Sequence, residues 1–263
     1  MKNIEVYANK KTFKPKDSIC VVTGGSSGIG KALIKELLIN KAKKVINIDI
    51  FESTLDKVDF YNCDVSNNDK LKSVIGKIFI KYKKIDLFCC NAGVAVDDDG
   101  LASEEHWENI WKINVMQHPN IVRNTISNMV SEGQGWYLIT ASAAGLLSQV
   151  GSATYSTTKH AAVGFSEWLS ITYGDKGIGV SVLCPQGVKT AMTSGLKNGG
   201  VAGINGMLEA KEVAKFTLNQ MMKGKFLITP HDIVRKYIKI KSENPDKWII
   251  GMRKLYKKFV NKT

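Results

Sequence analysis

The sequence predicts a single α/β domain in which a doubly wound parallel sheet carries helices on both faces. Short apolar runs rich in β-branched residues, typical of buried strands, alternate with longer stretches of helical spacing. A glycine-rich turn joins the first strand to the first helix. The length of 263 residues and the hydrophobic content of 44% suit one globular domain with a large core. Repeated strand–helix units favour a parallel sheet, because each helix packs back onto the sheet as the chain crosses over.

The first half of the chain supplies four of the expected strands. They cover residues 18–23, 44–48, 60–62 and 87–90, and the helices between them cover residues 31–40 and 67–82. A further helix begins after Ser103, whose hydroxyl can cap it, and another helical stretch runs through Asn114 to about Val130. Residues 1–17 form a polar arm ahead of the first strand, and we expect this arm to be loosely held.

The second half continues the alternation. Strands are expected over residues 136–140 and 180–184, with a helix over residues 153–173 between them. Residues 191–207 are rich in glycine, which gives the backbone freedom, and residues 231–260 carry apolar side chains at helical spacing. No linker rich in Pro, Gly and Ser divides the chain, so residues 18–263 are expected to form one domain that includes both segments.

The turn after the first strand is the first motif that points to a ligand. It carries Gly24, Gly28 and Gly30, in the order Gly-x-x-x-Gly-x-Gly, which differs from the common Gly-x-Gly-x-x-Gly fingerprint. Glycines allow the backbone to approach a pyrophosphate, and a helix N-terminus offers free N–H groups and the positive end of its dipole. We therefore expect a dinucleotide to bind at this turn.

Asp49 ends the second strand, nineteen residues after Gly30. This is about the distance at which a dinucleotide-binding fold places the carboxylate that holds the adenosine ribose. A carboxylate accepts hydrogen bonds from the ribose hydroxyls and repels a 2′-phosphate. Neither Arg nor Lys follows Asp49 or lies inside the turn, so the sequence favours NAD over NADP.

Tyr155 and Lys159 are four residues apart on a predicted helix, so they share one face. A free phenol has a pKa of about 10 and is a poor base at neutral pH, but a nearby cation lowers that value. Ser142 lies thirteen residues before Tyr155, at the end of the strand over residues 136–140. We expect Lys159 to lower the pKa of Tyr155, and Ser142 to hold a substrate oxygen beside the phenol.

With these motifs in order, the sequence resembles the classical short-chain dehydrogenase/reductase family from about Ser18 to Ile228. The resemblance implies a Rossmann-type fold and an enzyme that transfers a hydride between NAD and a secondary alcohol or ketone. It implies the catalytic residues Asn114, Ser142, Tyr155 and Lys159. It implies cofactor contacts from Gly24, Ser26, Ser27, Gly28, Ile29, Gly30, Asp49, Asp64, Val65, Asn91, Ala92, Gly93, Tyr155, Lys159, Pro185, Val188 and Thr190.

Two positions depart from the family pattern. Cys90 replaces an asparagine that supports neighbouring strands, and Gln186 replaces a glycine after Pro185, so its amide is expected to project toward the substrate. By the same resemblance, Asn114 holds a water that links Lys159 to solvent. Residues 191–207 are expected to form a mobile lid, and the resemblance implies a homodimer or homotetramer.

The substrate is expected to be apolar and to contact Ser142, Gln186 and Leu196. This expectation rests on the apolar side chains around Ser142 and in the lid, which ordinary packing would also explain. The C-terminal segment is expected to close over the site or to pack on another subunit. An NADP-linked ketoreductase and a non-catalytic nucleotide-binding regulator remain alternatives.

Charge and cysteine content limit the other classes of function. The formal net charge is +13, but the lysines spread along the chain without aromatic–basic motifs, so no nucleic-acid partner is expected. The five cysteines and four histidines have no metal-ligand spacing, so no metal is expected. No apolar run is long enough to span a membrane and no signal peptide is recognisable, so the sequence predicts a protein of the reducing cytoplasm without an integral membrane segment.

Overall fold

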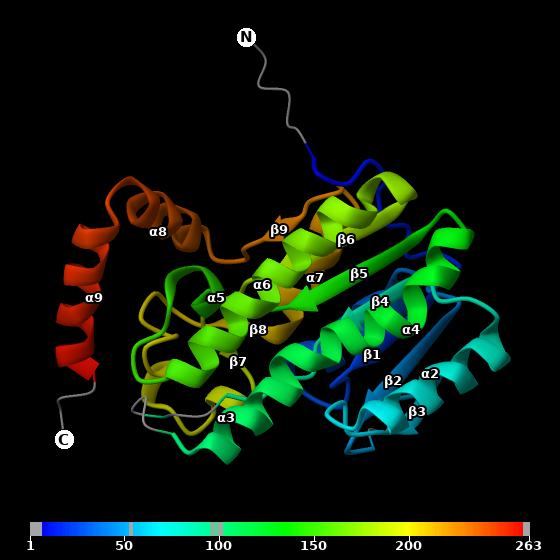
Figure 1. The fold of residues 1–263 in the computed structure, drawn as a ribbon, viewed down its shortest axis with the longest axis horizontal. Coiled ribbons are helices and arrows are strands. Elements are labelled where there is room, and N and C mark those ends of the chain that lie inside the picture. Colours follow the sequence, from blue (N-terminus) through cyan, green and yellow to red (C-terminus); the bar gives the residue numbers. More distant parts are fainter. Residues whose placement is uncertain (1–6, 53–54, 96–97, 99–101, 260–263) are drawn as a thin grey trace, which may run out of the picture.

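The computed structural model describes residues 7–52, 55–95, 98 and 102–259. A seven-stranded sheet runs through the molecule in the order β3-β2-β1-β4-β5-β6-β9, with every neighbouring pair parallel (Figure 1). The strands are β1 (Ile19–Thr23), β2 (Lys44–Asp49), β3 (Val58–Asn62), β4 (Leu87–Cys90), β5 (Gly135–Thr140), β6 (Ile178–Leu183) and β9 (Leu227–Ile228). The strand order reverses between β1 and β4, so the predicted doubly wound α/β fold is confirmed.

Helices cover both faces of this sheet (Figure 1). The α-helices along the chain are α1 (Gly28–Ile39), α2 (Asn68–Tyr82), α3 (Glu104–Trp111), α4 (Gln117–Ser131), α5 (Ala144–Leu147), α6 (Ala153–Tyr173), α7 (Ala210–Met221), α8 (Asp232–Glu243) and α9 (Pro245–Phe259), of which α9 stands away from the sheet. Successive side chains of a strand point to opposite faces. Val21 therefore packs in the core with α2, α4 and α6, whereas Val22 packs in the core with α1 and α7.

Most of the predicted elements are present, and the differences have local causes. The small second sheet of β7 (Val188–Lys189) and β8 (Leu208–Glu209) was not predicted, since two residues are too short for a periodic pattern. The strand β9, of two residues, and the helix α5, of four, are also too short for such a pattern. The helix α7 was also missed, although Val213, Leu218 and Met221 lie buried at helical spacing and could have revealed it.

The predicted helix through Asn114 is interrupted. The segment Lys112–Met116 forms a π-helical turn, η1, which joins α3 to α4. A π-turn holds one more residue than an α-turn and is frequent at functional sites. The irregular turn directs Asn114 toward the interior, where it is only 1% exposed.

The N-terminal arm is docked over the residues that the structure describes, 7–17, so the expectation of a loose arm is wrong there; residues 1–6 lie outside the described residues. The side chain of Asn9 is 7% exposed and pairs with the backbone at the edge of β6, where no strand in the described part of the chain lies alongside. Its amide donates to the carbonyl oxygens of Val180, at 2.9 Å, and Gly224, at 3.0 Å, and accepts from the Val180 N–H at 2.8 Å. The side-chain amide thus satisfies backbone groups of β6 that β9 is too short to reach.

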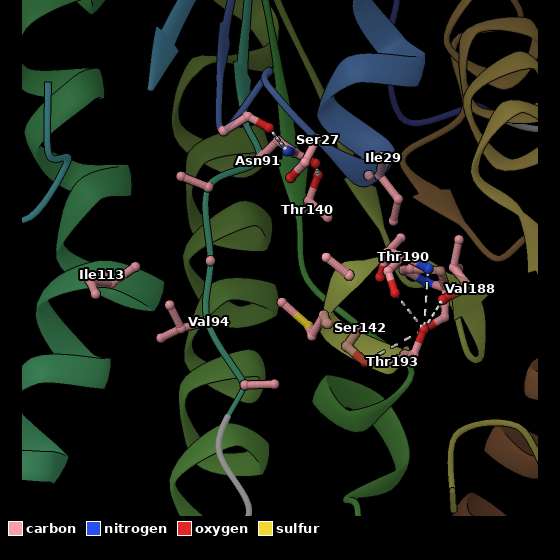
Figure 2. A pocket seen from close by; sticks show the side chains of 18 of the residues that line it. Ser27, Ile29, Asn91, Val94, Ile113, Thr140, Ser142, Val188, Thr190 and Thr193 are labelled. Atoms are coloured by element: carbon pink, nitrogen blue, oxygen red, sulfur yellow. Dashed lines mark hydrogen bonds between the residues drawn. The ribbon is translucent and has the colours of Figure 1, made fainter. Parts of the chain in front are cut away.

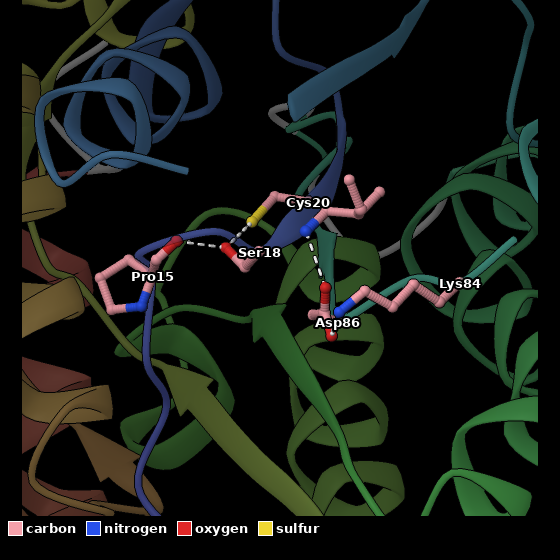
Figure 3. A network of polar contacts seen from close by, with 6 residues as sticks. Pro15, Ser18, Cys20, Lys84 and Asp86 are labelled. Carbon is pink, nitrogen blue, oxygen red and sulfur yellow. Dashed lines mark hydrogen bonds and ion pairs between the residues drawn. The ribbon is translucent and has the colours of Figure 1, made fainter. Parts of the chain in front are cut away.

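A second network fixes the start of β1 (Figure 3). The Ser18 hydroxyl donates to the Pro15 carbonyl at 2.5 Å, so its contact with the Cys20 sulfur, at 3.1 Å, has the thiol as donor. The carboxylate of Asp86 accepts from the Ile19 N–H at 2.8 Å and pairs with Lys84 at 2.9 Å. Burial raises the pKa of Cys20 to about 12, which keeps this thiol protonated.

We predict that Asn9→Ala destabilises the fold by about 3 kcal/mol, because two buried backbone groups of Val180 lose their partners and water cannot replace them. Chemical denaturation of the full chain measures this. Lys10→Ala is the matched control, because it removes an ion pair between the side chains of Lys10 and Asp175, which are 73% and 84% exposed. This change should leave the free energy of unfolding almost unaltered. An Asn9→Ala variant as stable as the Lys10→Ala variant would contradict this account of the arm.

Candidate active site

A cavity of about 400 Å³ lies at the carboxyl ends of the strands, where the strand order reverses. The cavity brings together nearly all the residues that the sequence singled out. Its wall includes Gly24, Ser27, Gly28, Ile29, Asp49, Asp64, Val65, Asn91, Ala92, Gly93, Ser142, Tyr155, Lys159, Pro185, Gln186, Val188, Thr190 and Leu196. Ser26, Gly30 and Asn114 do not line this wall and support it from behind.

The glycine turn leaves a space that side chains at the glycine positions would fill. Gly24 and Gly28 have φ angles of +66° and +50°, which L-residues with a side chain rarely adopt. A Cβ on Gly30 would lie 2.1 Å from the carbonyl oxygen of Gly24, so only glycine allows the chain to close here. This bare cradle, at the N-terminus of α1, fits the pyrophosphate of a dinucleotide.

Asp49 stands at the end of β2, at the rim of the cavity. One of its carboxylate oxygens accepts from the Ser26 N–H at 2.9 Å and the other from the Phe51 N–H at 3.1 Å. The side chain is 9% exposed and still lines the cavity. Asp49 therefore holds the turn in shape and also presents negative charge where a ribose would lie, so the residues present fit an unphosphorylated adenosine ribose.

Ser26 holds the back of the turn and does not face the cavity. Its hydroxyl donates to the carbonyl of Phe51 and accepts from the amide of Asn47 at 3.0 Å. The same Asn47 side chain accepts from the Gly25 N–H at 3.0 Å. The hydrogen bonds of Ser26 thus support the turn, and its role as a cofactor contact remains a prediction.

Asn91 ties three strand ends together, and Figure 2 shows its position near Thr140. Its amide donates to the backbone carbonyl of Thr23 at 3.1 Å, and its carbonyl oxygen accepts from the Thr140 hydroxyl at 3.1 Å. The Thr23 hydroxyl accepts from the N–H groups of Asn91 and Ala92, at 2.9 and 3.0 Å. The strand support that Cys90 put in doubt is therefore supplied by Asn91, while Cys90 itself is fully buried in the core.

Lys159 projects from α6 into the buried side of the cavity and is 4% exposed. Its ammonium donates to the Thr140 carbonyl at 3.0 Å and lies 5.5 Å from the centre of the Tyr155 ring. Burial lowers the pKa of Lys159 to about 8. The cation is therefore held close to the phenol, as the spacing predicted, but it is itself costly to keep charged.

Tyr155 is partly buried one turn before Lys159. Burial raises the pKa of its phenol, and the Ser142 hydroxyl beside it acts in the opposite direction. This direction is opposite to the expected lowering of the Tyr155 pKa by Lys159, because the loss of hydration outweighs the opposing hydrogen bond from Ser142. The protonated phenol is thus the resting form of Tyr155.

Ser142 follows β5 and lines the cavity between Tyr155 and Pro185. Its oxygen accepts from the Ala144 N–H at 3.1 Å and stands 3.5 Å from the Pro185 carbonyl, toward which the hydroxyl points. The long second distance leaves the hydroxyl free to turn to a ligand oxygen.

Asn114 lies beside Lys159 without reaching the cavity. Its amide accepts from the Val94 N–H and donates to the Val94 carbonyl, both at 2.9 Å. A second donated bond, of 3.2 Å, reaches Thr158, the residue before Lys159. These bonds occupy the side chain in fixing the loop after β4, and its role in holding a water remains a prediction.

The helix α6, which carries Tyr155 and Lys159, starts at a cap that sequence reasoning missed. Asp98 accepts from the Ala153 N–H at 3.0 Å, from the Thr154 N–H at 3.3 Å and from the hydroxyls of Ser152 and Thr154, at 3.2 and 2.5 Å. A carboxylate here satisfies orphan N–H groups and suits the positive end of the helix dipole. The bond spans more than fifty residues of chain, so no local pattern could reveal it.

A second missed residue, His231, shapes the substrate side. Its Nδ1 accepts from the Gln186 N–H at 3.2 Å, which places the ring hydrogen on Nε2, and Nε2 donates to the Gly187 carbonyl at 3.0 Å. Burial lowers the pKa of His231, so it stays neutral. The Gln186 side chain lies at the cavity wall, where its carbonyl oxygen accepts from Asn205 at 3.3 Å.

His118, one turn after Asn114, is also buried and was not singled out by its sequence context. Burial, with the charge of Lys159 nearby, lowers its pKa to about 3, and the Asn114 carbonyl opposes this shift. Neither ring nitrogen makes a hydrogen bond of normal geometry within the part of the chain that the structure describes. The neutral ring therefore adds no charge to the site.

Just before the predicted lid, at Thr190, a reciprocal pair of hydrogen bonds caps the short helix η3 (Ala191–Thr193). Figure 2 shows Thr193 bonded to Val188 and Thr190 at the edge of the cavity. A second short helix, η4 (Lys197–Gly199), follows. Leu196 lies between them and is 40% exposed at the cavity wall.

All five cysteines are free and buried. Over the described ranges, no group of His, Cys, Asp and Glu side chains is arranged to hold a metal ion. Within the same ranges, none of the helices has the length and apolar character needed to cross a bilayer.

Comparison with known proteins agrees with this geometry. A family model described as short chain dehydrogenase matches residues 18–199, well over half of the chain. Short chain aldehyde dehydrogenase 1 of Euphorbia lathyris is 30% identical over 218 residues, which make up 78% of this chain and 73% of that protein.

Two solved structures extend the similarity. A short chain dehydrogenase/reductase from Burkholderia phymatum in complex with NAD matches with a TM-score of 0.80 at 25% identity, over 89% of this chain and 96% of that one. A short chain dehydrogenase from Burkholderia cenocepacia in complex with NADP matches with a TM-score of 0.79 at 17% identity, over 89% and 97%, which shows the shared fold alone. This chain belongs to the short-chain dehydrogenase/reductase family of oxidoreductases, whose Rossmann-like fold it shares.

Proposed function

We propose that this protein is an NAD-dependent oxidoreductase that transfers a hydride between the nicotinamide and a secondary alcohol or ketone of apolar character. The observation that carries the proposal is the convergence of Ser142, Tyr155 and Lys159 on one wall of a cavity whose far rim carries Asp49 and the glycine turn. A non-catalytic regulator would need the rim but not this wall.

The chemistry follows from the positions of these groups. When bound, the cofactor accepts or supplies the hydride. In oxidation, Tyr155 takes the proton of the substrate hydroxyl as the carbonyl forms; in reduction, it returns a proton to the same oxygen. Ser142 donates a hydrogen bond to that oxygen and orients it. Lys159 binds the nicotinamide ribose and favours the phenolate of Tyr155 once that charge develops.

The raised pKa of Tyr155 supports a role as proton donor, because the phenol at the cavity wall is protonated at neutral pH. For oxidation the same shift acts against the enzyme, since the phenolate is scarce below the raised pKa. Turnover in the oxidative direction should therefore rise with pH, and the reductive direction should be favoured toward neutral pH.

Asp49 supports NAD as the cofactor. Its carboxylate stands at the rim of the cavity, already holding two N–H groups, and offers no cation to pair with a 2′-phosphate. Placing a phosphate there would bring two anions together in a partly dehydrated site. An NADP-linked enzyme would instead need a basic side chain at this rim.

Other features of the proposal rest on surfaces and composition. The apolar residues Ile113, Met192 and Leu196 at the cavity wall support an apolar substrate. Exposed Trp168 and Ile171 on α6, at 50% and 83%, support a homodimer or homotetramer. The free, buried cysteines support a reducing compartment such as the cytoplasm.

The first prediction from this proposal is that Tyr155→Phe lowers kcat about 100-fold or more while NAD still binds, because the ring remains and the proton-transfer group is lost. Steady-state assays with a panel of alcohols and ketones, together with calorimetric titration of NAD, measure the two effects. Tyr173→Phe, on the same helix, is the control and should keep full activity. A Tyr155→Phe enzyme with more than about a tenth of wild-type kcat would rule out this role.

The second prediction concerns cofactor choice. We expect kcat/KM with NAD to exceed that with NADP at least about tenfold, which corresponds to about 1.4 kcal/mol. Asp49→Asn keeps an acceptor for the Ser26 N–H but removes the negative charge of the carboxylate. It should therefore lower the ratio of kcat/KM with NAD to kcat/KM with NADP. Equal or better efficiency of the wild-type enzyme with NADP would overturn the assignment.

The third prediction concerns residues 191–207. We expect fast amide exchange at Leu196–Ile204 in the free enzyme and slower exchange when NADH and a ketone-like inhibitor are bound together, because the segment then orders over the substrate. Hydrogen exchange measured by mass spectrometry reports this, with α7 as an internal reference. Strong protection in the free protein, unchanged by ligands, would show a permanently packed connection and remove the lid from the mechanism.

A further inference from the structure

The C-terminal helix α9 carries an apolar stripe that stays partly exposed in the part of the chain that the structure describes. The stripe consists of Trp248, Ile249, Met252, Leu255, Tyr256 and Phe259, which fall within about one third of the circumference of the helix at 100° per residue. No residue of α9 is buried, and Ile249 and Tyr256 are 49% and 42% exposed. In Figure 1 the helix stands at the end of the molecule opposite to α2 and β3, beside α8 and away from the sheet.

The remaining surface of α9 is mainly basic, with Ile250, at 52% exposed, as an apolar exception. It carries Lys247, Arg253, Lys254, Lys257 and Lys258, all exposed, against a single acid, Asp246. By the same helical spacing, Arg253 borders one side of the apolar stripe and Lys258 the other. Residues 232–259, which form α8 and α9, contain nine Lys and Arg and three Asp and Glu. These two helices therefore produce a positive electrostatic potential at this end of the molecule.

The position of α9 is set by α8 and not by the core. The ring of Trp248 lies 5.8 Å from that of Tyr237, and Val234 of α8 is buried against Ala143 and Leu147. Lys241 of α8 donates to the Leu146 carbonyl at 2.6 Å. One end of the stripe, at Trp248, is therefore anchored on α8, while Ile249 and Tyr256 remain exposed.

Charge decides which occupant suits the stripe. A second copy placed on it would bring two strongly basic helical pairs together in a chain whose net charge is already +13, and like charges at an interface are repulsive. An anionic lipid surface accepts the apolar side chains at the boundary of headgroups and acyl chains and pairs the cations with phosphates. Helices with a basic face and an opposite face of Trp, Phe and Leu bind in this way.

We propose that α9 docks this protein reversibly on anionic lipid surfaces, with the apolar stripe in the lipid interface and the surrounding lysines and arginines at the headgroups. Each basic residue near such a surface strengthens binding, and salt weakens it. The proposal is independent of the reaction, because lipid binding can be measured without turnover. It also explains why so apolar a stripe is tolerated on the outside of the molecule.

A short series of hydrogen bonds connects α8, which supports the proposed lipid contact, to the wall of the cavity. From α8, which carries α9, the Tyr237 hydroxyl donates to Asn205 at 3.4 Å, and Asn205 in turn donates to Gln186 at the cavity wall. His231, which precedes α8, holds the backbone of Gln186 and Gly187. One short helix thus joins the proposed lipid contact to the loops on the substrate side.

The test is co-sedimentation of the purified full-length protein with vesicles of pure phosphatidylcholine and with vesicles that contain phosphatidylglycerol at about one third of the lipid. We expect binding to the anionic vesicles only, reversed by high salt. A fluorescence measurement complements it: brominated acyl chains should quench tryptophan emission in the wild-type protein, because Trp248 then lies in the interface.

Variants assign the contact to α9. Lys254→Glu with Lys258→Glu should weaken vesicle binding at least about tenfold, whereas Lys211→Glu with Lys215→Glu, the same change at the same spacing on exposed α7 residues, should have a much smaller effect. Ile249→Ser with Tyr256→Ser should also weaken binding, and Ile39→Ser with Ile80→Ser, at other exposed apolar positions, should not. Circular dichroism of each variant confirms that it is folded.

Three outcomes would overturn the proposal. The first is equal binding to neutral and anionic vesicles, or none to either. The second is equal loss of binding in the α7 and α9 charge variants, which would assign the effect to net charge. The third is a dimer by sedimentation equilibrium that dissociates in the Ile249→Ser, Tyr256→Ser variant while lipid binding is absent, which would assign the stripe to a second copy.

Discussion

The active-site geometry depends on hydrogen bonds that join the carboxyl ends of three parallel strands. Thr23, Asn91 and Thr140 follow or end β1, β4 and β5, and Asn91 bonds to both threonines. The backbone carbonyl of Thr140 then receives the ammonium of Lys159. Because a shift of one residue would turn the side chains of a strand to the opposite face, the register of these strands decides whether the cavity forms at all.

Burial sets the electrostatic state of this cavity. It raises the pKa of Tyr155 and lowers that of Lys159 to about 8, so each side chain is pushed toward its neutral form. Two neutralising shifts on neighbouring groups make the site responsive to any charge that enters it, since the low-dielectric surroundings strengthen that charge's effect. The surroundings of Tyr155 and Lys159 therefore set their pKa values, and the spacing of the two residues in the helix only brings their side chains together.

The substrate side is assembled from segments far apart in the chain. Asp98 caps the helix that carries Tyr155, and His231 fixes the loop that carries Gln186. The same loop leads through Asn205 to α8, and α8 supports α9. The cofactor side, by contrast, comes mainly from one strand–turn–helix unit and the end of the next strand. The loop that carries Gln186 is thus joined to the C-terminal helices by a continuous series of contacts.

The sequence by itself determined the features that depend on near neighbours. The glycine turn, the strand periodicity, Asp49 and the Tyr155–Lys159 spacing are all local, so they predicted the sheet and most of the residues that line the cavity. Tertiary structure alone decided the docking of Asn9 on β6, the cap from Asp98, the clamp by His231 and the direction of the Tyr155 pKa shift. These depend on which distant groups meet and on how much water they lose, and a linear pattern carries information on neither.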